Sequence, residues 1–379
     1  MVQGFTRRWL ASGIAAITLL ATNGLALVKF DDGHDQIFVN ASVSIGYDSN
    51  IFARKDGGGD TLTTTSFGIE YARHAGYIAV NASIVWSLGQ FGSNPDQNFS
   101  NPTLNLELIK STGRTTGSFT VNAARQSSSD AVANTRTDSW TYTTGLNWKY
   151  PVIDRYSLAG DFNYGLVSYQ QAPPGIYNLT SYGASLDLFY TYTSERDLIA
   201  GYSIKINDAD GANSQSIDHN FTVGMSGKIT SKLNGTVRAG YEIRQESATG
   251  QSFGSWSASA AVTWSVNRRL TFTGTLTKDF TTSSTDASID SLNAALNAQY
   301  VVSAHWIVYS GIGGGESKFL SGTDTGRQDY YFTWNAGVGY NLNEHFKASL
   351  TYAFYESWSN RSASNYDRNS LTLNLSTRW

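Results

Sequence analysis

The last ten residues of the chain, SLTLNLSTRW, alternate between apolar and polar side chains. Odd positions carry Leu371, Leu373, Leu375 and Trp379, whereas even positions carry Ser370, Thr372, Asn374, Ser376 and Arg378. A period of two is the geometry of an extended strand, so the segment has one apolar face and one polar face. A chain that repeats this pattern must form a sheet whose two sides meet different environments.

The same alternation recurs along the chain with the regular spacing of hairpins. Clear two-faced segments lie at 37–49, 136–150, 270–281, 328–342 and 346–358. Tight turns are expected at 74–76 and near Gly113, Ile153, Glu195, Ser231, Asn267, Ala304 and Glu344. Longer polar connections are expected at 53–60, 91–100, 127–135, 171–176, 208–214, 246–251, 282–287, 319–327 and 359–366. About nine loops and eight turns predict about 18 strands, with 16 as the alternative count.

The composition separates two all-β folds, a soluble sandwich and a membrane barrel. Charged residues make up only 15% of the chain, hydrophobic residues 40% and aromatic residues 13%, with 22 Tyr and 10 Trp. A sandwich exposes its polar faces to bulk water and favours Lys and Glu there. A barrel in lipid needs apolar and aromatic groups outside and small polar groups inside, which is the composition found here.

The aromatic positions also match the dimensions of a membrane. Trp140 and Tyr150 share one strand face and lie ten residues apart, which is about 33 Å of strand. Tilted by about 45°, this length projects to about 23 Å, close to the apolar band of an outer-membrane barrel. The sequence therefore predicts a single closed antiparallel transmembrane β-barrel over residues 37–379, with short periplasmic turns and longer extracellular loops.

Closure of the barrel follows from the same physical argument. Lipid offers no hydrogen bonds, so every strand edge must be paired within the protein. The first strand, 37–49, is therefore expected to pair with the last, 368–379.

The N-terminus predicts export through the inner membrane. Arg7 and Arg8 precede an apolar run at 9–21, and Gly24-Leu25-Ala26 offers a cleavage site between small residues. This pattern is typical of a secretory signal peptide, predicted for residues 1–26. Residues 27–36 are then a short periplasmic segment. No later stretch approaches 18 continuous apolar residues, so no transmembrane helix is expected.

The polar face of the strands predicts a water-filled lumen. The charged candidates for this face are Asp48, Glu70, Glu107, Lys149, Asp161, Asp187, Lys205, Arg238, Glu242, Asp279 and Lys347. Small polar side chains cannot fill a barrel of this size, so water should. The alternative is that each charge serves as a structural ion pair along the wall. No loop is long enough to form a large constriction loop, and the N-terminal segment is too short for a globular plug.

The search for catalytic or cofactor sites favours no enzyme and no cofactor. The five histidines, His34, His74, His219, His305 and His345, do not share a polar face with a serine and a carboxylate. The segment NDADGAN at 207–213 lacks the closing Glu of a calcium loop. GIGGG at 311–315 lacks the Lys-Ser/Thr of a phosphate-binding loop. The net charge of −3 favours no nucleic-acid partner.

Two short motifs resemble those of a known family. The heptad GYDSNIF at 46–52 resembles a motif near the start of β-barrel porins of the Gram-negative outer membrane, a group with relatives beside exopolysaccharide export systems. Leu371, Leu373, Leu375 and the terminal aromatic Trp379 resemble the signal that such barrels carry for their insertion machinery.

The resemblance and the polar inner face together imply a channel. The expected function is passive diffusion of small hydrophilic solutes through an outer-membrane porin. The alternative is an accessory barrel of exopolysaccharide export or surface assembly, with Tyr169, Phe189 and Tyr309 as sugar-stacking platforms. The expected partners are outer-membrane lipid, the insertion machinery and small solutes or polysaccharide. A homo-oligomer is left open.

Overall fold

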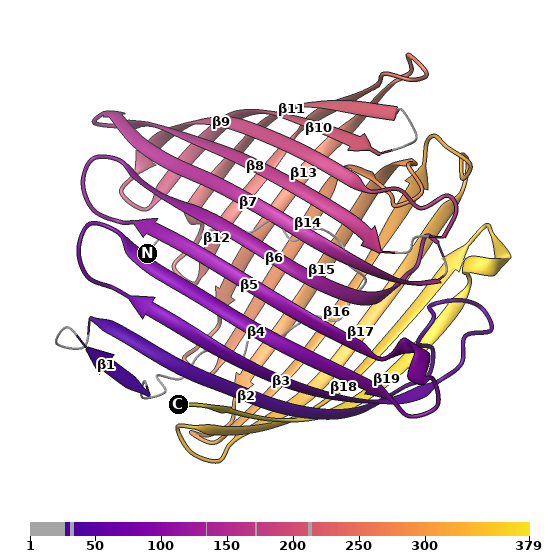
Figure 1. Ribbon diagram of the computed structural model, residues 1–379. Helices are drawn as coiled ribbons and strands as arrows, with labels where there is room; N and C mark the ends of the chain where they lie inside the picture. The colour runs from indigo at the N-terminus through magenta and orange to yellow at the C-terminus, as the bar shows by residue number, and fades with distance from the viewer. Residues whose placement is uncertain (1–26, 31–33, 134, 171–172, 211–213) are drawn as a thin grey trace.

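A computed structural model describes residues 27–30, 34–133, 135–170, 173–210 and 214–379. These residues form a β-barrel with long tilted strands (Figure 1). The strands are β1 (Val28–Phe30), β2 (Asp35–Asp48), β3 (Asp60–Arg73), β4 (Ala79–Phe91), β5 (Phe99–Lys110), β6 (Thr116–Asp130), β7 (Thr135–Ile153), β8 (Tyr156–Gln170), β9 (Leu179–Thr193), β10 (Arg196–Ala209), β11 (Ser214–Lys228), β12 (Leu233–Glu246), β13 (Ser252–Ser265), β14 (Leu270–Thr282), β15 (Ser288–Val301), β16 (Trp306–Phe319), β17 (Gln328–Asn341), β18 (Phe346–Ser359) and β19 (Tyr366–Arg378).

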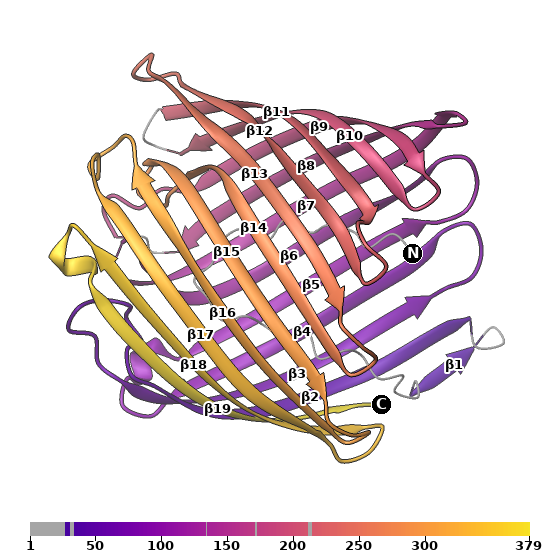
Figure 2. The ribbon, with the colours of Figure 1, turned by 180° about the vertical axis from the view of Figure 1, so that it is seen from behind.

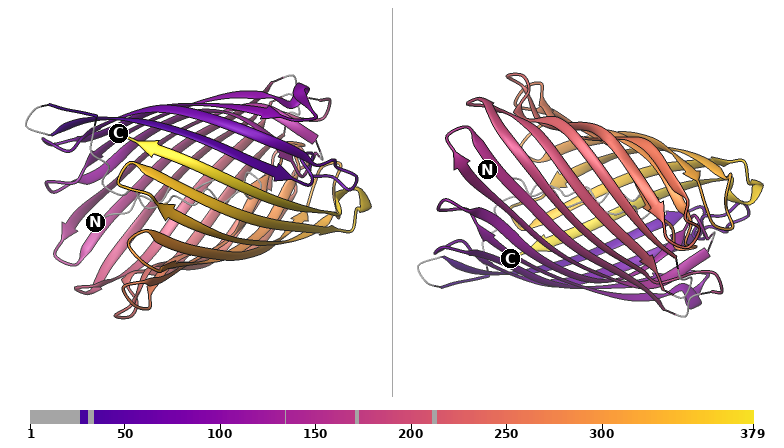
Figure 3. Two further views of the ribbon diagram at one scale, coloured as in Figure 1. Left: turned by 90° about the horizontal axis from the view of Figure 1, so that it is seen from below. Right: turned by 90° about the horizontal axis from the view of Figure 1, so that it is seen from above.

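Each strand from β2 to β19 pairs antiparallel with its neighbours in chain order. The ring closes where β19 pairs with β2, from Ser370 opposite Asp48 to Arg378 opposite Asn40. Figure 3 shows the indigo first strand beside the yellow last strand at this seam. The predicted all-β barrel of 18 strands and its predicted closure are therefore confirmed.

The short strand β1 continues the line of β19 at the seam. The last residue of β19 reaches Val39, with the Trp379 amide donating to the Val39 carbonyl at 3.0 Å. Beyond this point, Val28 lies opposite Ile37 of β2. The backbone of residues 28–30 thus covers an edge of β2 that β19 is too short to reach.

Connections at the two ends of the barrel differ in length. Eight tight turns, all at the predicted places, lie at the end that holds the C-terminus, here called the turn end. The longer connections lie at the opposite loop end (Figure 2). Two of them contain single-turn 3₁₀ helices, Pro95–Gln97 and Ser362–Ser364. Within the described residues, no helix is long and apolar enough to cross a membrane.

The outer surface of the barrel is apolar. Ile45 and Leu373 face each other across the seam, and they are 57% and 55% exposed. Large apolar side chains on most of the other strands share this exposure, including Phe67, Trp86, Val223 and Trp256. A soluble sandwich would bury these side chains in its core, so this surface requires lipid as its solvent.

The N-terminal predictions are only partly within the described residues. The predicted signal peptide, 1–26, lies outside them, as does 31–33 within the predicted periplasmic segment 27–36. The first barrel strand begins at Asp35, two residues before the predicted start.

A charge on the lipid-facing side of the seam should oppose folding. Leu373→Lys places an ammonium on the outer face, at a cost of about 2–4 kcal/mol if it lies near the bilayer midplane. We expect the variant, folded into lipid vesicles, to unfold at a lower urea midpoint than the wild type. The heat-dependent shift in gel mobility monitors the folded fraction. Asn374→Lys, on the opposite face of the same strand, is the control and should change the midpoint much less. Equal losses in the two variants would contradict the assignment of faces.

Candidate functional site

Two hairpins leave the barrel wall at the loop end. The β5–β6 ladder stops at Thr103 opposite Ala124, although the β6–β7 ladder continues to Asp130. The β13–β14 ladder stops at Ala258 opposite Lys278, although the β14–β15 ladder continues to Thr282. We call residues 125–133 with 135–138 the β6–β7 tip, and residues 279–290 the β14–β15 tip. Each tip is paired within itself but not with the preceding strand.

The β14–β15 tip folds onto the inner wall formed by β10 and β12. Lys205 Nζ donates to the carbonyl of Phe280 at 3.1 Å, and Glu242 Oε2 accepts the Phe280 amide at 3.3 Å. Arg244 Nη1 donates to the carbonyl of Thr281 at 2.7 Å. The Phe280 side chain is only 1% exposed. Lys205 and Glu242 therefore bind the carbonyl and the amide of Phe280, which have no partner on β13, since buried peptide groups must be paired.

A buried ion pair anchors this contact. Arg244 Nε and Nη2 donate to the two oxygens of Asp218 at 2.6 and 2.7 Å, and the two residues are 0% and 1% exposed. Arg244 Nη1 also donates to Ser288 Oγ at 3.2 Å. Two parallel bonds neutralise both charges, and the remaining donors of Arg244 reach the tip. Such a pair tolerates burial only because both partners are present.

Charges on the outer strand face accompany the inward bend. Lys278 and Asp290 have the parity of the lipid-facing Leu276 and Leu296, and they form an ion pair with each other. Ser255 Oγ donates to Asp290 Oδ2 at 3.2 Å. Because Ser255 has inner-face parity on β13, the back of the tip lies against the lumen side of that strand.

The β6–β7 tip bends inward from the other side of the barrel. Arg368 Nη1 on β19 donates to Ser129 Oγ at 3.4 Å. Arg136 Nη1 donates to the carbonyl of Ile51 at 3.4 Å, and its guanidinium lies 4.9 Å from the centre of the Phe91 ring. These partners belong to β19, the β2–β3 loop and β4, none of which neighbours β6 or β7 in the sheet.

The two tips meet inside the barrel. Ser284 Oγ donates to Asp130 Oδ2 at 2.6 Å. Val132 packs against a buried apolar cluster of Ala287, Ile289 and Phe319. Six strands, β8–β13, separate the two hairpins on one side, and eight, β16–β19 and β2–β5, on the other. The contact therefore joins nearly opposite walls, and we call it the bridge.

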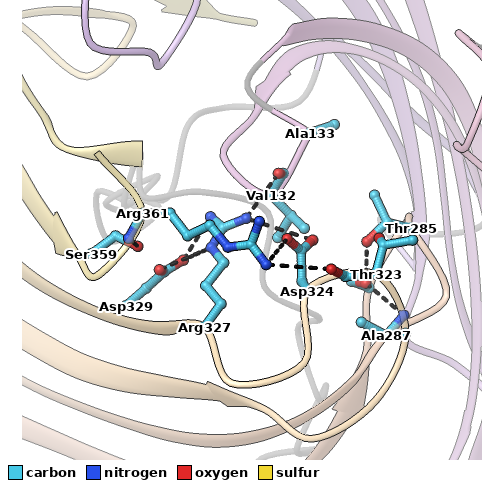
Figure 4. A network of polar contacts seen from close by, with 12 residues as sticks. Val132, Ala133, Thr285, Ala287, Thr323, Asp324, Arg327, Asp329, Ser359 and Arg361 are labelled. Atoms are coloured by element: carbon cyan, nitrogen blue, oxygen red, sulfur yellow. Dashed lines mark hydrogen bonds and ion pairs between the residues drawn. The ribbon is translucent and has the colours of Figure 1, made fainter. Parts of the chain in front are cut away.

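A buried arginine clamps the bridge (Figure 4). Arg327, in the β16–β17 loop, donates through Nη1 to the carbonyl of Val132 at 3.2 Å and through Nη2 to that of Ala131 at 3.4 Å. Its Nε donates to both oxygens of Asp329 at 2.9 Å. The β8–β9 loop also joins the bridge, since the Tyr177 amide donates to the carbonyl of Ser284 at 2.9 Å.

The predicted lumen candidates lie in three kinds of surroundings. Five are in four ion pairs: Asp48 with Arg368, Glu70 with Arg378, Lys149 with Asp197, and Asp187 with Arg238. Lys205 and Glu242 hold the β14–β15 tip, and Asp279 belongs to it. Glu107 and Asp161 accept from Asn81 and Asn163, and Lys347 lines a cavity of about 400 Å³ near the turn end. That all of them border the lumen stays a prediction.

The Asp187–Arg238 pair depends on two glycines. Its bidentate bonds of 2.8 Å connect β9 to β12, across the two intervening strands. A Cβ on Gly201 would lie 2.0 Å from Asp187 Oδ1, and one on Gly224 would lie 2.9 Å from Arg238 Cγ. The two long side chains therefore lie flat on the wall because β10 and β11 have no side chains at the crossing.

Several residues of the site were absent from the sequence-based candidates. Asp218, Arg244 and Arg368 lie on inner-face parity, so the period-two pattern could have included them. Asp130 and Arg327 lie at a strand end and in a loop, where no periodic signal exists. The loops are as short as expected. Because strand ends form the bridge, loop length did not reveal it. Within the described residues, no group of three or more His, Asp or Glu side chains could hold a metal ion.

A closed barrel with a lipid-compatible outer face and a polar inner face defines an outer-membrane channel protein. A family model described as Putative beta-barrel porin 2 matches residues 155–303 and 201–379. Together the matches span 155–379, which is more than half of the 379 residues, and the chain belongs to this family. It is an outer-membrane porin of Gram-negative type, from a family of channels. The loop end is therefore extracellular and the turn end periplasmic.

Solved outer-membrane barrels resemble this chain in architecture. OpdK of Pseudomonas aeruginosa, solved with vanillate, is 11% identical with a TM-score of 0.49, covering 90% of this chain and 99% of its own. OccAB2 of Acinetobacter baumannii is 9% identical with a TM-score of 0.49, covering 91% and 98%. The siderophore receptor PirA of P. aeruginosa is 10% identical with a TM-score of 0.46, covering 90% and 80%. No curated protein matched the sequence.

Removing the clamp should release the β6–β7 tip. Arg327→Met keeps the length of the side chain but leaves Asp329 without its cation, and breaking a buried pair costs about 3–5 kcal/mol. We expect faster hydrogen exchange in residues 126–133 and little change in the heat resistance of the barrel. Arg361→Met is the matched control, because its side chain is half exposed and contacts the same loop. Similar exchange in the two variants would contradict the role of Arg327.

Proposed function

We propose that the protein is a passive diffusion channel for small hydrophilic solutes. The observation that carries this proposal is the exposure of Thr273, Thr275 and Thr277 on β14. Their parity is opposite to that of the lipid-facing Leu276, so they are accessible from the inside of a closed ring. Side chains do not fill the barrel at this level, and water should occupy it.

The charges on the inner strand faces support solutes without a strong preference for one ion. Acidic and basic groups both occur on these faces, and several neutralise each other, as Asp187 and Arg238 do at 2.8 Å. No ladder of like charges is found on the described strands. A field of one sign would concentrate one kind of ion, whereas mixed, paired charges favour small polar solutes in general.

The remaining parts of the proposal concern export and assembly. Residues 1–26 act as a signal peptide, and residues 27–36 stay in the periplasm. Leu371, Leu373, Leu375 and Trp379 form the signal for the insertion machinery; they are between 42% and 55% exposed on the outer face, where another protein can reach them. A homo-oligomer in the membrane remains compatible with this surface.

A second candidate function is passage or export of a polysaccharide. Tyr309, one of the expected platforms for sugars, is 7% exposed, and Lys149 Nζ lies 4.2 Å from the centre of the Phe189 ring. Tyr169 is half-buried on β8. A different pair supports this candidate better: Tyr331 stacks on Tyr355 at 5.9 Å between ring centres, and both side chains are half-buried. Blockage of the conductance by oligosaccharides, lost in Tyr355→Ala, would favour this function.

The diffusion channel can be tested with two variants, one with a cysteine on the inner strand face and one with a cysteine on the outer face, because the chain contains no cysteine of its own. In planar bilayers, we expect discrete conductance steps from the wild type. A charged thiosulfonate that cannot cross lipid should lower the conductance of Thr275→Cys by more than about a tenth, because charge and bulk narrow the water column.

Leu296→Cys is the matched control on the neighbouring strand. Its side chain is 44% exposed on the outer face, and lipid should protect it from the reagent. A folded protein without conductance steps, or a reagent that acts at residue 296 and not at 275, would refute the channel.

A further inference from the structure

We propose that the β14–β15 tip is a gate with two positions, one in the lumen and one in the wall. The inference rests on the proposed channel function. In the closed position, seen here, the tip forms the bridge. In the open position it pairs with the free edge of β13 and leaves the lumen.

The free edge of β13 is matched to the tip. The β12–β13 ladder reaches Ser252, whereas the β13–β14 ladder stops at Ala258 opposite Lys278. Continuing the same register would place Trp256 opposite Phe280, and Ser255 opposite Thr281. Trp256 is 53% exposed on the outer face, so Phe280 would join it as an aromatic cross-strand pair at the edge of the lipid. The alternation of side chains along the tip is thus compatible with a position in the wall as well as with its position in the lumen.

The tip is held together by its own contacts, and its second strand stays paired with β16 at Ile289 and Asp290. The Ser283 amide donates to the carbonyl of Ala287 at 3.0 Å, and the Ala287 amide donates to Ser283 Oγ at 3.0 Å. Asp286 takes a left-handed backbone conformation with φ of 59° to close this turn. The ion pair of Lys278 with Asp290 joins the two strands at the base of the tip. None of these contacts needs to break when the tip changes position.

Opening exchanges the hydrogen bonds of Phe280. In the closed position, Lys205 and Glu242 bind the carbonyl and the amide of Phe280, and Arg244 binds the carbonyl of Thr281. In the open position, β13 would bind the two groups of Phe280, whereas the carbonyl of Thr281 faces β15 and would lose only its bond from Arg244. Arg244 would keep its two bonds to Asp218, and Lys205 and Glu242 carry opposite charges, so no isolated charge remains. Two arrangements with similar sets of bonds are what a bistable element requires.

The contacts at the far end of the tip act as its latch. They are the Ser284 hydroxyl on Asp130, the Tyr177 amide on the carbonyl of Ser284, and the packing of Val132 on Ala287. All three contacts involve residues of the β14–β15 tip. The bridge between opposite walls therefore depends on a few contacts, whereas Lys205, Glu242 and Arg244 hold the base of the tip on the near wall.

Two cysteine pairs should trap the two positions. Asp130→Cys/Ser284→Cys, joined by a short bifunctional thiosulfonate, locks the closed position and should lower the conductance at least tenfold until a reductant restores it. Trp256→Cys/Phe280→Cys should form a direct disulfide only in the open position, where cross-strand partners have the required spacing. This bond should hold the conductance at its highest level.

The control pair is Ser66→Cys/Ser87→Cys. Its hydroxyls lie 2.8 Å apart on neighbouring strands that stay in the wall, so the same reagent should leave the conductance nearly unchanged. The doubly substituted Asp130→Ala/Ser284→Ala, which lacks the latch, should spend more time open than the wild type. Folding of every variant is checked by its heat-dependent gel mobility.

The outcomes separate the gate from the channel. Full conductance after cross-linking residues 130 and 284, or failure of that pair to cross-link, overturns the gate and leaves the diffusion channel intact. Failure of residues 256 and 280 to form a disulfide in conducting channels also overturns the gate. A latch-free variant that spends more time open than a conducting wild type supports it. Silence of all variants, the latch-free one included, overturns both proposals.

Discussion

The structure depends on one constraint, that every backbone amide and carbonyl at membrane depth must find a partner inside the protein. Lipid supplies no hydrogen bonds, and each unpaired group would cost several kcal/mol. Pairing of β19 with β2 removes the last two free edges. Even the short stretch of β2 beyond the end of β19 is covered, by β1. The ring is therefore continuous where lipid surrounds it.

At the loop end the constraint changes, because water and polar side chains become available. There the pairing of β5 with β6 and of β13 with β14 stops several residues before β6 and β14 reach their loops. Pro102, which has no amide hydrogen to donate, directly precedes Thr103, where the pairing of β5 with β6 begins. The released strand ends can then serve another purpose, and in this protein they cross the lumen. The mouth of the channel is thus made from the same hairpins as its wall.

Side chains of the wall take the place of a neighbouring strand in this arrangement. Glu242 accepts an amide, while Lys205 and Arg244 donate to carbonyls. These groups can be charged inside the barrel because each is neutralised or hydrogen-bonded there, as Arg244 is by Asp218. A surface that binds a backbone through side chains holds it less permanently than a ladder does. This is the physical basis for a strand end that can take two positions.

Period-two alternation alone determined the strand faces, the turns, the number of strands and the closure of the ring. It could do so because each of these depends on local parity and on the need to pair edges in lipid. Only the tertiary structure decided which strand ends leave the wall. Lys278 lies where β14 separates from β13, yet Glu316 and Lys318 have the same parity on β16, which stays paired with both neighbours. The pairing of Asp187 with Arg238 and the meeting of Asp130 with Ser284 join residues 51 and 154 positions apart. No local pattern encodes such distances, because they follow from the curvature of the closed ring and from the space that glycines leave on its inner wall.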